Sequence, residues 1–382
     1  MTHRERFRAA AAHRQADRAA YDLCGSPQTM VDYQATKDRL ARLLGVTGEK
    51  RGHFCVDERI LEALDIDTRL VGGMPTPTTS HCRRENGVSK ETEVSFDSWG
   101  IGRRAVDGRM EICHSPLKGA GIDEIMVYEF PDPANVDMER VRLWAEQAEH
   151  LHKHTDYAVI AEHPVLGVFE LGCWMFGFDD YLYRLAGEPE AVHAFSGRVL
   201  AYQKEIIRKY YGALGRWIDC TTSGDDFGTQ AGPFMSTAMF EEMIKPYLQA
   251  RVAYTRQFTD AFYKHHTCGS VHNLIPSLIG CGVDILNPIQ PGAYKMEPER
   301  LKADFGGRIA FWGGIDTQHL LPGGTARQVR EEVKRVLSIM GNSGYILSPA
   351  HTIQYDVPAE NVIAIYAGAR EYEGNLQAME KR

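Results

Sequence analysis

The 382-residue sequence has no long hydrophobic run, no excess of positive charge and no paired cysteine motif. No apolar stretch reaches the roughly 18 residues that a membrane span requires. A net charge of -8 and a pI near 6.0 argue against nucleic acid or an anionic membrane as a partner. The N-terminal stretch MTHRERFRAAAAHRQADR is too charged for a signal peptide and is typical of a helix. The eight cysteines stand singly, which suits reduced thiols better than disulfides. We therefore expect a cytoplasmic enzyme of unspecified oligomeric state.

A GxGxxG motif after the first strand is also missing, so a dinucleotide-binding fold gains little support. Instead, short apolar runs alternate with longer amphipathic segments, a pattern that predicts βα units and a parallel sheet. The runs lie at 157–161, 166–171, 216–223, 260–266, 283–288, 308–314 and 344–349. Runs this short favour an α/β fold of the (β/α)8 TIM-barrel type, with the barrel core in residues 155–382. Residues 1–154 are then an N-terminal decorating segment of helices and a small β subdomain, packed on the barrel in one structural domain.

Polar side chains follow several of these runs at the point where each predicted strand ends. Glu170 ends one run, Asp226 follows the next, His266 and Cys268 follow a third, and His351 follows the last. In a barrel the C-terminal ends of all strands meet at one mouth, where such enzymes place their chemistry. The sequence therefore predicts that these five side chains converge there.

The stretch KHHTCGS places His266 and Cys268 two residues apart, so on extended backbone both side chains could reach one Zn2+. His351 is a candidate third ligand, and Glu170 or Asp226 a candidate fourth, because zinc accepts nitrogen, sulfur and oxygen ligands. The same residues leave other interpretations open. Cys268 could be a packed thiol, or a nucleophile beside a histidine with no identifiable orienting group. Asp226 could instead serve as a general acid or base.

Four stretches of the chain resemble the uroporphyrinogen decarboxylase superfamily: SGDDFGTQ, HTCGSVHNLIPSLIGCGVDILNPIQ, FWGGIDTQHLLPGGT and GYILSPAHTIQYDVPAENV. The likeness covers nearly the whole chain and is strongest to the uroporphyrinogen decarboxylase-like proteins linked to corrinoid-dependent methyl transfer. This resemblance implies a TIM-type barrel with its site in the mouth. In the methyltransferase members a His-x-Cys pair and a later cysteine hold a zinc that positions a methyl donor or thiol for exchange with a cobalamin cobalt. The resemblance thus implies His266 and Cys268 as zinc ligands here.

The chain departs from the pattern of this superfamily in two places. It has His351, in the sequence Ser-Pro-Ala-His, where the methyltransferases carry the later cysteine. Imidazole in place of thiolate still binds zinc but makes the metal more Lewis acidic. The chain also reads DRAAYDLCGSP where true decarboxylases carry an arginine-bearing motif that grips porphyrinogen carboxylates. Uroporphyrinogen decarboxylase activity is therefore disfavoured.

The sequence leads to the hypothesis of a zinc-dependent methyltransferase of the demethylase type. It would move a methyl group from a small methyl ether, amine or thiol to a corrinoid, with Zn2+ on His266, Cys268 and His351 and with Glu170 or Asp226 as fourth ligand or proton donor. No DxHxxG-type cobalt-ligating loop is present, so the corrinoid (cobalamin) must arrive free or on a separate corrinoid protein. Two alternatives stay open: a metal-assisted decarboxylase or lyase with Asp226 as its acid, and a non-catalytic barrel that binds a ligand without metal.

Overall fold

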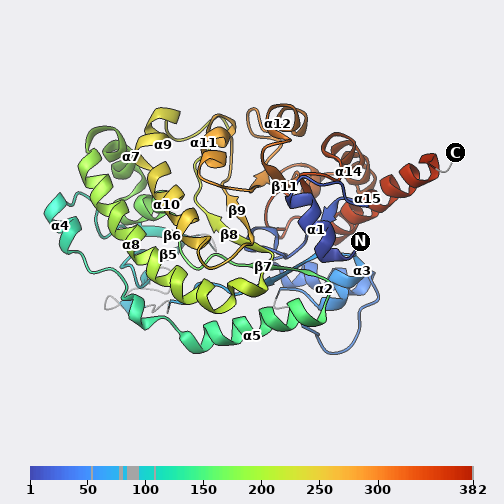
Figure 1. Cartoon of the computed structure of the whole chain (residues 1–382), viewed down its shortest axis with the longest axis horizontal. Helices are drawn as coiled ribbons and strands as arrows, with labels where there is room; N and C mark the ends of the chain where they lie inside the picture. Colours follow the sequence, from blue (N-terminus) through green and yellow to red (C-terminus); the bar gives the residue numbers. More distant parts are fainter. Residues whose placement is uncertain (53–54, 77–80, 84–93, 107–108, 381–382) are drawn as a thin grey trace.

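Eight parallel strands form the central sheet of the protein and roll into a (β/α)8 barrel. The computed structural model describes residues 1–52, 55–76, 81–83, 94–106 and 109–380. The strands follow the order β1–β12–β11–β10–β9–β8–β7–β2, and they lie in the middle of the molecule with helices around them (Figure 1). The predicted barrel fold is confirmed. Its strands are β1 (Ala20–Tyr21), β2 (Thr68–Val71), β7 (Ala158–Ala161), β8 (Cys220–Gly224), β9 (Phe262–His266), β10 (Ile285–Ile289), β11 (Ala310–Ile315) and β12 (Tyr345–Pro349).

Helices connect the strands and cover the outside of the barrel (Figure 1). Helix α14 shows why they form: Thr325 caps its N-terminus by accepting the N–H of Gln328, and its buried positions recur at helical spacing. None of the helices in the described part of the chain is long and apolar enough to cross a membrane. The helices are α1 (His3–Ala11), α2 (Gln34–Leu43), α3 (Glu58–Ala63), α4 (Ile122–Val127), α5 (Met138–His154), α6 (Val168–Phe176), α7 (Phe178–Gly187), α8 (Pro189–Leu214), α9 (Thr237–Met243), α10 (Lys245–Thr255), α11 (Ile275–Gly280), α12 (Pro298–Phe305), α13 (Leu320–Gly323), α14 (Ala326–Met340) and α15 (Ala359–Glu380).

The barrel begins well before residue 155, where we expected it to begin. Strands β1 and β2 come from the segment assigned to decoration, and their few residues, AY and TRLV, are too short to show a period-two pattern. They lie at the two ends of the strand order, and Asp67 bridges them. Its backbone N–H donates to the carbonyl oxygen of Tyr21 over 2.9 Å, and its Oδ2 accepts the N–H of Tyr21 over 2.6 Å. The N-terminal segment thus supplies two strands of the barrel as well as helices around it.

Helix α1 closes the N-terminal end of the barrel, opposite the mouth. Its Phe7 is fully buried and packs edge-on against Trp312 of β11, with ring centroids 5.6 Å apart. Arg8 extends from the same helix to Asp219, the residue before β8, over 2.8 Å. Helix α1 thus fills the centre of this end of the barrel.

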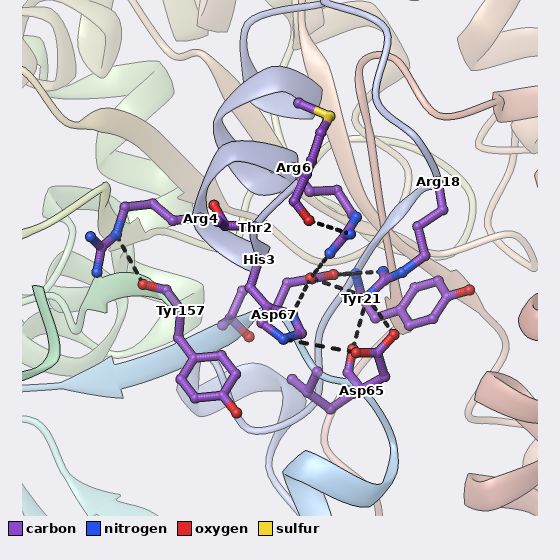
Figure 2. A network of polar contacts seen from close by, with 12 residues as sticks. Thr2, His3, Arg4, Arg6, Arg18, Tyr21, Asp65, Asp67 and Tyr157 are labelled. Atoms are coloured by element: carbon purple, nitrogen blue, oxygen red, sulfur yellow. Dashed lines mark hydrogen bonds and ion pairs between the residues drawn. The ribbon is translucent and has the colours of Figure 1, made fainter. Parts of the chain in front are cut away.

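A buried ionic network fixes this closed end. Arg6 of α1 and Arg18, just before β1, converge on the two oxygens of Asp67 over 2.6 and 2.8 Å (Figure 2). Burial alone would raise the pKa of Asp67, but the hydrogen bond from His3 and the charges of Arg18 and Arg6 outweigh it, so the pKa is lowered. Asp67 is therefore an ionised carboxylate at the barrel seam.

A separate antiparallel sheet of β3 (His81–Arg83), β4 (Val94–Phe96), β5 (Gly102–Val106) and β6 (Arg109–His114) forms the small β subdomain. The antiparallel strands predicted from about residue 94 are confirmed up to residue 114. Further on, where strands were also expected, residues 122–127 form α4. The predicted turn at Asp107-Gly108 lies outside the described residues.

The prediction of a strand at 166–171 is wrong, because α6 begins at Val168. This short run of five apolar residues and Glu170 fits either a buried strand or a buried helix, and its period cannot separate the two. The buried carboxylate of Asp225, at the end of β8, accepts the backbone N–H groups of Phe169 and Glu170 over 3.0 and 2.7 Å. A side chain more than fifty residues away thus caps this helix, and Glu170 lies in its first turn instead of at a strand end.

Candidate metal centre

The three predicted metal ligands lie together at the barrel mouth. His266 ends β9, Cys268 follows it by two residues, and His351 lies just beyond β12. One ligand atom from each lies within 4.8 Å of the other two. The Nε2 of His266 is 3.3 Å from the Sγ of Cys268, and the rings of His266 and His351 have centroids 5.6 Å apart. Side chains from two distant strands therefore converge on one point.

This donor set fits a zinc ion. With Zn–S near 2.3 Å and Zn–N near 2.0 Å, a tetrahedral site separates sulfur and nitrogen ligands by about 3.5 Å. The 3.3 Å between His266 and Cys268 is close to that value. Imidazole and thiolate ligands suit zinc, whereas magnesium and calcium prefer oxygen. Three protein ligands also leave a fourth position open to a water or a substrate atom.

Asn287 of β10 orients His266. These two residues are partners in the β9–β10 register, so their side chains lie on the same face of the sheet. The Nδ2 of Asn287 donates to the carbonyl oxygen of Trp312 over 3.1 Å, which directs Oδ1 toward the Nδ1 of His266, 2.7 Å away. Because Oδ1 only accepts, the imidazole carries its proton on Nδ1 and presents the lone pair of Nε2 to Cys268.

Burial lowers the pKa of His266 to about 4 and also lowers the pKa of His351. Both imidazoles are therefore neutral at pH 7, the state in which they bind metal. Burial raises the pKa of the Cys268 thiol, and the negative charge of Asp226 raises it further. Metal binding would accordingly release one proton, from the cysteine.

The loop that carries Cys268 is held by two side-chain acceptors. The backbone N–H of Cys268 donates to Oδ1 of Asp226 over 2.7 Å, and that of Gly269 donates to Oε1 of Gln290 over 2.9 Å. Gly269 has φ +77, and a Cβ there would lie 2.6 Å from the backbone of Gly228. Only glycine fits this position, so the glycine behind the cysteine serves the close approach of two mouth loops.

The two aspartates after β8 have different environments, as expected for consecutive residues on an extended backbone. Asp225 is buried and caps α6. Asp226 faces the ligands: its Oδ1 is 3.7 Å from Nε2 of His266, and its side chain is 36% exposed. Of the pair, Asp226 alone is placed to act on a bound metal or substrate.

Glu170 reaches the same region from α6. Burial raises its pKa to about 8, with further contributions from the negative charges of Asp225 and Asp226. Its charge in turn acts on the Cys268 thiol. A carboxyl group with such a pKa is protonated at pH 7, so Glu170 is better suited to donate a proton than to act as an anionic ligand.

Two further ionisable side chains near the mouth were not predicted. Lys264 lies two residues before His266 in β9, fully buried, with its Nζ 4.7 Å from the ring centre of Trp312 and no hydrogen-bond partner in the described part of the chain. Glu162 follows β7, and burial raises its pKa to about 7. The sequence pattern could have indicated both residues. Side chains two residues apart in a strand lie on the same face of the sheet, which places Lys264 on the face of His266, and Glu162 follows directly after a strand.

A cavity of about 500 Å³ opens above the candidate ligands Cys268 and His351. The rest of its lining is mostly amide and hydroxyl side chains, from Thr229, Gln230, Gln290, Thr317, Gln318, Thr352 and Gln354. Its volume is typical of sites for small molecules. The candidate metal centre thus borders a ligand-sized space at the open end of the barrel.

The protein is thus a (β/α)8 barrel with nitrogen and sulfur side chains that could hold a metal ion at its mouth. Residues 105–372, most of the chain, match the family described as uroporphyrinogen decarboxylase (URO-D). The chain belongs to this family. The comparison with curated proteins gives no match.

Two solved structures resemble the whole chain. A methyltransferase from Methanosarcina mazei aligns with a TM-score of 0.62 at 15% identity, over 97% of this chain and 99% of its own. A B12-independent methionine synthase from Shewanella sp. W3-18-1, in complex with selenomethionine, aligns with a TM-score of 0.45 at 13% identity, over 97% of this chain and 100% of its own. At this identity the first likeness establishes the shared fold, and the activity has to be argued from the site.

Proposed function

We propose that this protein is a zinc-dependent methyltransferase that moves a methyl group from a small methylated substrate to a corrinoid. The observation that carries the proposal is the convergence of His266, Cys268 and His351 beside a ligand-sized cavity. Three protein ligands leave one zinc position for the heteroatom that bears the methyl group. The methyltransferase that shares this fold supports the same class of reaction.

Zinc, when bound, would act as a Lewis acid that polarises the methyl-bearing heteroatom. Asn287 keeps His266 in the ligating tautomer, and Asp226 holds the backbone of Cys268 in place. Glu170, protonated at neutral pH, would give its proton to the heteroatom. In this reaction the carbon–heteroatom bond would break, and its electron pair would stay on the heteroatom, which takes the proton from Glu170. The methyl group would pass to the corrinoid, whose reduced cobalt would supply the electron pair of the new bond.

The corrinoid is a second substrate in this proposal. The sequence contains no cobalt-ligating loop of the DxHxxG type. The cobalamin would therefore come from a separate corrinoid protein or from solution in the cytoplasm, and it would meet the methyl donor at the open end of the barrel.

A second candidate is a metal-assisted decarboxylase, favoured by the family name and by the partly exposed carboxylate of Asp226 at the site. One observation weighs against a porphyrinogen substrate. Arg18, the arginine of DRAAYDLCGSP, is buried and bonds Asp65 and Asp67 at the closed end of the barrel. It is thus turned away from the mouth and cannot hold substrate carboxylates there.

The test is to mix zinc-loaded and chelator-stripped protein with reduced cob(I)alamin and a panel of methyl ethers, methylamines and methyl thioethers. Appearance of the methylcobalamin spectrum with the zinc-loaded protein alone is the expected result. Cys281→Ala is a matched control, since Cys281 is buried beside α11 and remote from the ligand set. No methylation across the panel, together with carbon dioxide release from a carboxylated substrate, would favour the decarboxylase. Purified protein that binds no metal would favour a non-catalytic barrel.

A further inference from the structure

The cavity above the candidate ligands has a neutral lining. Seven of its described lining residues carry amide or hydroxyl side chains, four glutamines and three threonines, and none of its described lining residues is an aspartate, glutamate, lysine or arginine. Amides and hydroxyls both donate and accept hydrogen bonds without carrying charge. The lining is therefore chemically matched to a neutral, hydrogen-bonding ligand.

Two of the four amides are available to such a ligand. Gln290 already accepts the N–H of Gly269, and Gln354 donates to Asp32 over 3.3 Å. Gln230 and Gln318 make no side-chain hydrogen bond within the described part of the chain, and both are exposed on loops that border the cavity. Each can offer two N–H donors and one carbonyl acceptor.

The charged side chains described beside the cavity are two aspartates, Asp316 and Asp226. Asp316 lies beside the lining, but its carboxylate accepts the backbone N–H groups of Gln318, His319 and Leu320 at the start of α13. Asp226 lies beneath, next to His266. A carboxylate entering the cavity would lose water, find no cationic side chain in the lining and approach a second negative charge.

An ammonium group on the ligand would also find few favourable contacts in the cavity. None of the described lining residues is a phenylalanine, tyrosine or tryptophan, over whose ring a cation could stack. A bound zinc would have its two positive charges balanced by the Cys268 thiolate and by Asp226, so the site as a whole would not attract a cation.

We propose that the methyl donor carries a neutral hydrogen-bonding group, such as a carboxamide or a hydroxyl, which Gln230 and Gln318 bind. This inference rests on the proposed methyl transfer for its choice of methyl-bearing ligands. It specifies their chemistry further: methoxy compounds that bear a carboxylate or an ammonium group are poor ligands for this site.

The test is equilibrium binding to the zinc-loaded full-length protein at pH 7, measured by calorimetry without corrinoid. Three ligands share the 4-methoxyphenyl ring and carry a neutral, an anionic or a cationic group opposite the methoxy group: 4-methoxybenzamide, 4-methoxybenzoate and 4-methoxybenzylammonium. The neutral amide should bind at least about tenfold more tightly than either charged compound, the ratio expected when a charge is left without a partner. Equal or tighter binding of a charged compound would overturn the proposal, and so would a lack of measurable binding by all three.

Variants assign the effect to the lining. Gln318→Lys should shift the preference toward 4-methoxybenzoate by about tenfold or more, because it places a cation at the cavity. Gln249→Lys, on an exposed position of α10 where the glutamine bonds the carbonyl of Gly280, should leave the preference unchanged. If the ratio of affinities for 4-methoxybenzamide and 4-methoxybenzoate changed equally in both variants, the selectivity could not be assigned to the cavity lining. Because binding is measured without the acceptor, neutral preference without methyl transfer would refute the proposed reaction and leave this inference standing.

Discussion

Replacement of Asn287 by leucine tests whether the histidine at the end of β9 is a metal ligand. Asn287 is fully buried, and its Oδ1 lies 2.7 Å from Nδ1 of His266. Leucine has nearly the same volume but no acceptor, so His266 would lose the partner that fixes its ring and its tautomer. Loss of such an outer partner typically weakens metal binding by about 10- to 100-fold, or about 1.4 to 2.7 kcal/mol.

The same substitution also affects stability. It leaves the Nδ1–H of His266 and the carbonyl oxygen of Trp312 without their amide partner. An unsatisfied buried polar group costs about 1–3 kcal/mol, so the free energy of unfolding of the metal-free protein should fall by a similar amount. Asn287→Asp keeps an acceptor beside His266 and should retain zinc affinity.

The assay is competition for zinc against a chelating dye, combined with urea unfolding of the metal-free protein. Asn361→Leu is the matched control, since Asn361 is also buried and its amide donates to the carbonyls of Leu321 and Gly324, both over 2.8 Å. It should lower stability without changing zinc affinity. Wild-type zinc affinity in Asn287→Leu, or an equal loss in Asn361→Leu, would refute the reasoning.

The remaining predictions concern the ligands and the closed end of the barrel. About one zinc ion per chain should copurify, and His266→Ala and Cys268→Ala should each remove most of it, whereas Cys281→Ala should retain it; elemental analysis measures the zinc content. His351→Cys should keep zinc because thiolate is also a ligand, whereas His351→Ala should weaken zinc binding and abolish methyl transfer in the cob(I)alamin assay. Asp67→Asn should lower the free energy of unfolding by about 3–5 kcal/mol at pH 7, because it removes the fully buried carboxylate that Arg6 and Arg18 share and leaves them only their more exposed partners, Asp17 and Asp65.

The pH dependence of the Asp67 effect has a definite sign. The pKa of Asp67 in the folded protein is lowered, so its carboxylate stabilises the fold above the unfolded-state pKa of about 3.9, and this contribution is lost as the pH falls further. The difference in urea stability between wild type and Asp67→Asn should therefore shrink toward pH 3. Asp65→Asn is the control, because Asp65 is 45% exposed and its pairing with Arg18 is worth little. If Asp65→Asn lowered the free energy of unfolding as much as Asp67→Asn, the distinction between the buried ion pairs of Asp67 and the exposed ion pair of Asp65 would be wrong.

Much of the barrel could be predicted because its later strands are short β-rich runs bounded by helices. The run 260–266 gave β9 and the run 344–349 gave β12 within two residues. The prediction for residues 166–171 was wrong because so short a run, mostly apolar, is compatible with both a helix and a buried strand. Strands β1 and β2 could not be predicted from a sequence pattern. They are defined by their pairing with β12 and β7, respectively, whose residues lie far along the chain.

The candidate ligands were accessible to sequence reasoning for a simple geometric reason. Strand ends of a barrel share one mouth, so His266, Cys268 and His351 could be placed together without knowing any contact. The role of Asn287 could not be predicted, because it depends on the register between β9 and β10, which pairs it with His266. The helical position of Glu170 also depends on a tertiary contact, the cap from Asp225.

His351 is a candidate metal ligand and also lines the cavity above the metal centre. A site of two neutral imidazoles and one thiolate keeps one more positive charge than a site of one imidazole and two thiolates, so a bound zinc would draw electrons more strongly from a fourth ligand. Asp226, 3.7 Å from His266, would balance that charge without being a thiolate donor. An ether oxygen is a poorer leaving group than a thiolate and needs both a stronger Lewis acid and a proton. In the proposed reaction Glu170 would supply that proton, because it is protonated at neutral pH. Among the methyl donors of the proposed reaction, we therefore propose a neutral methyl ether.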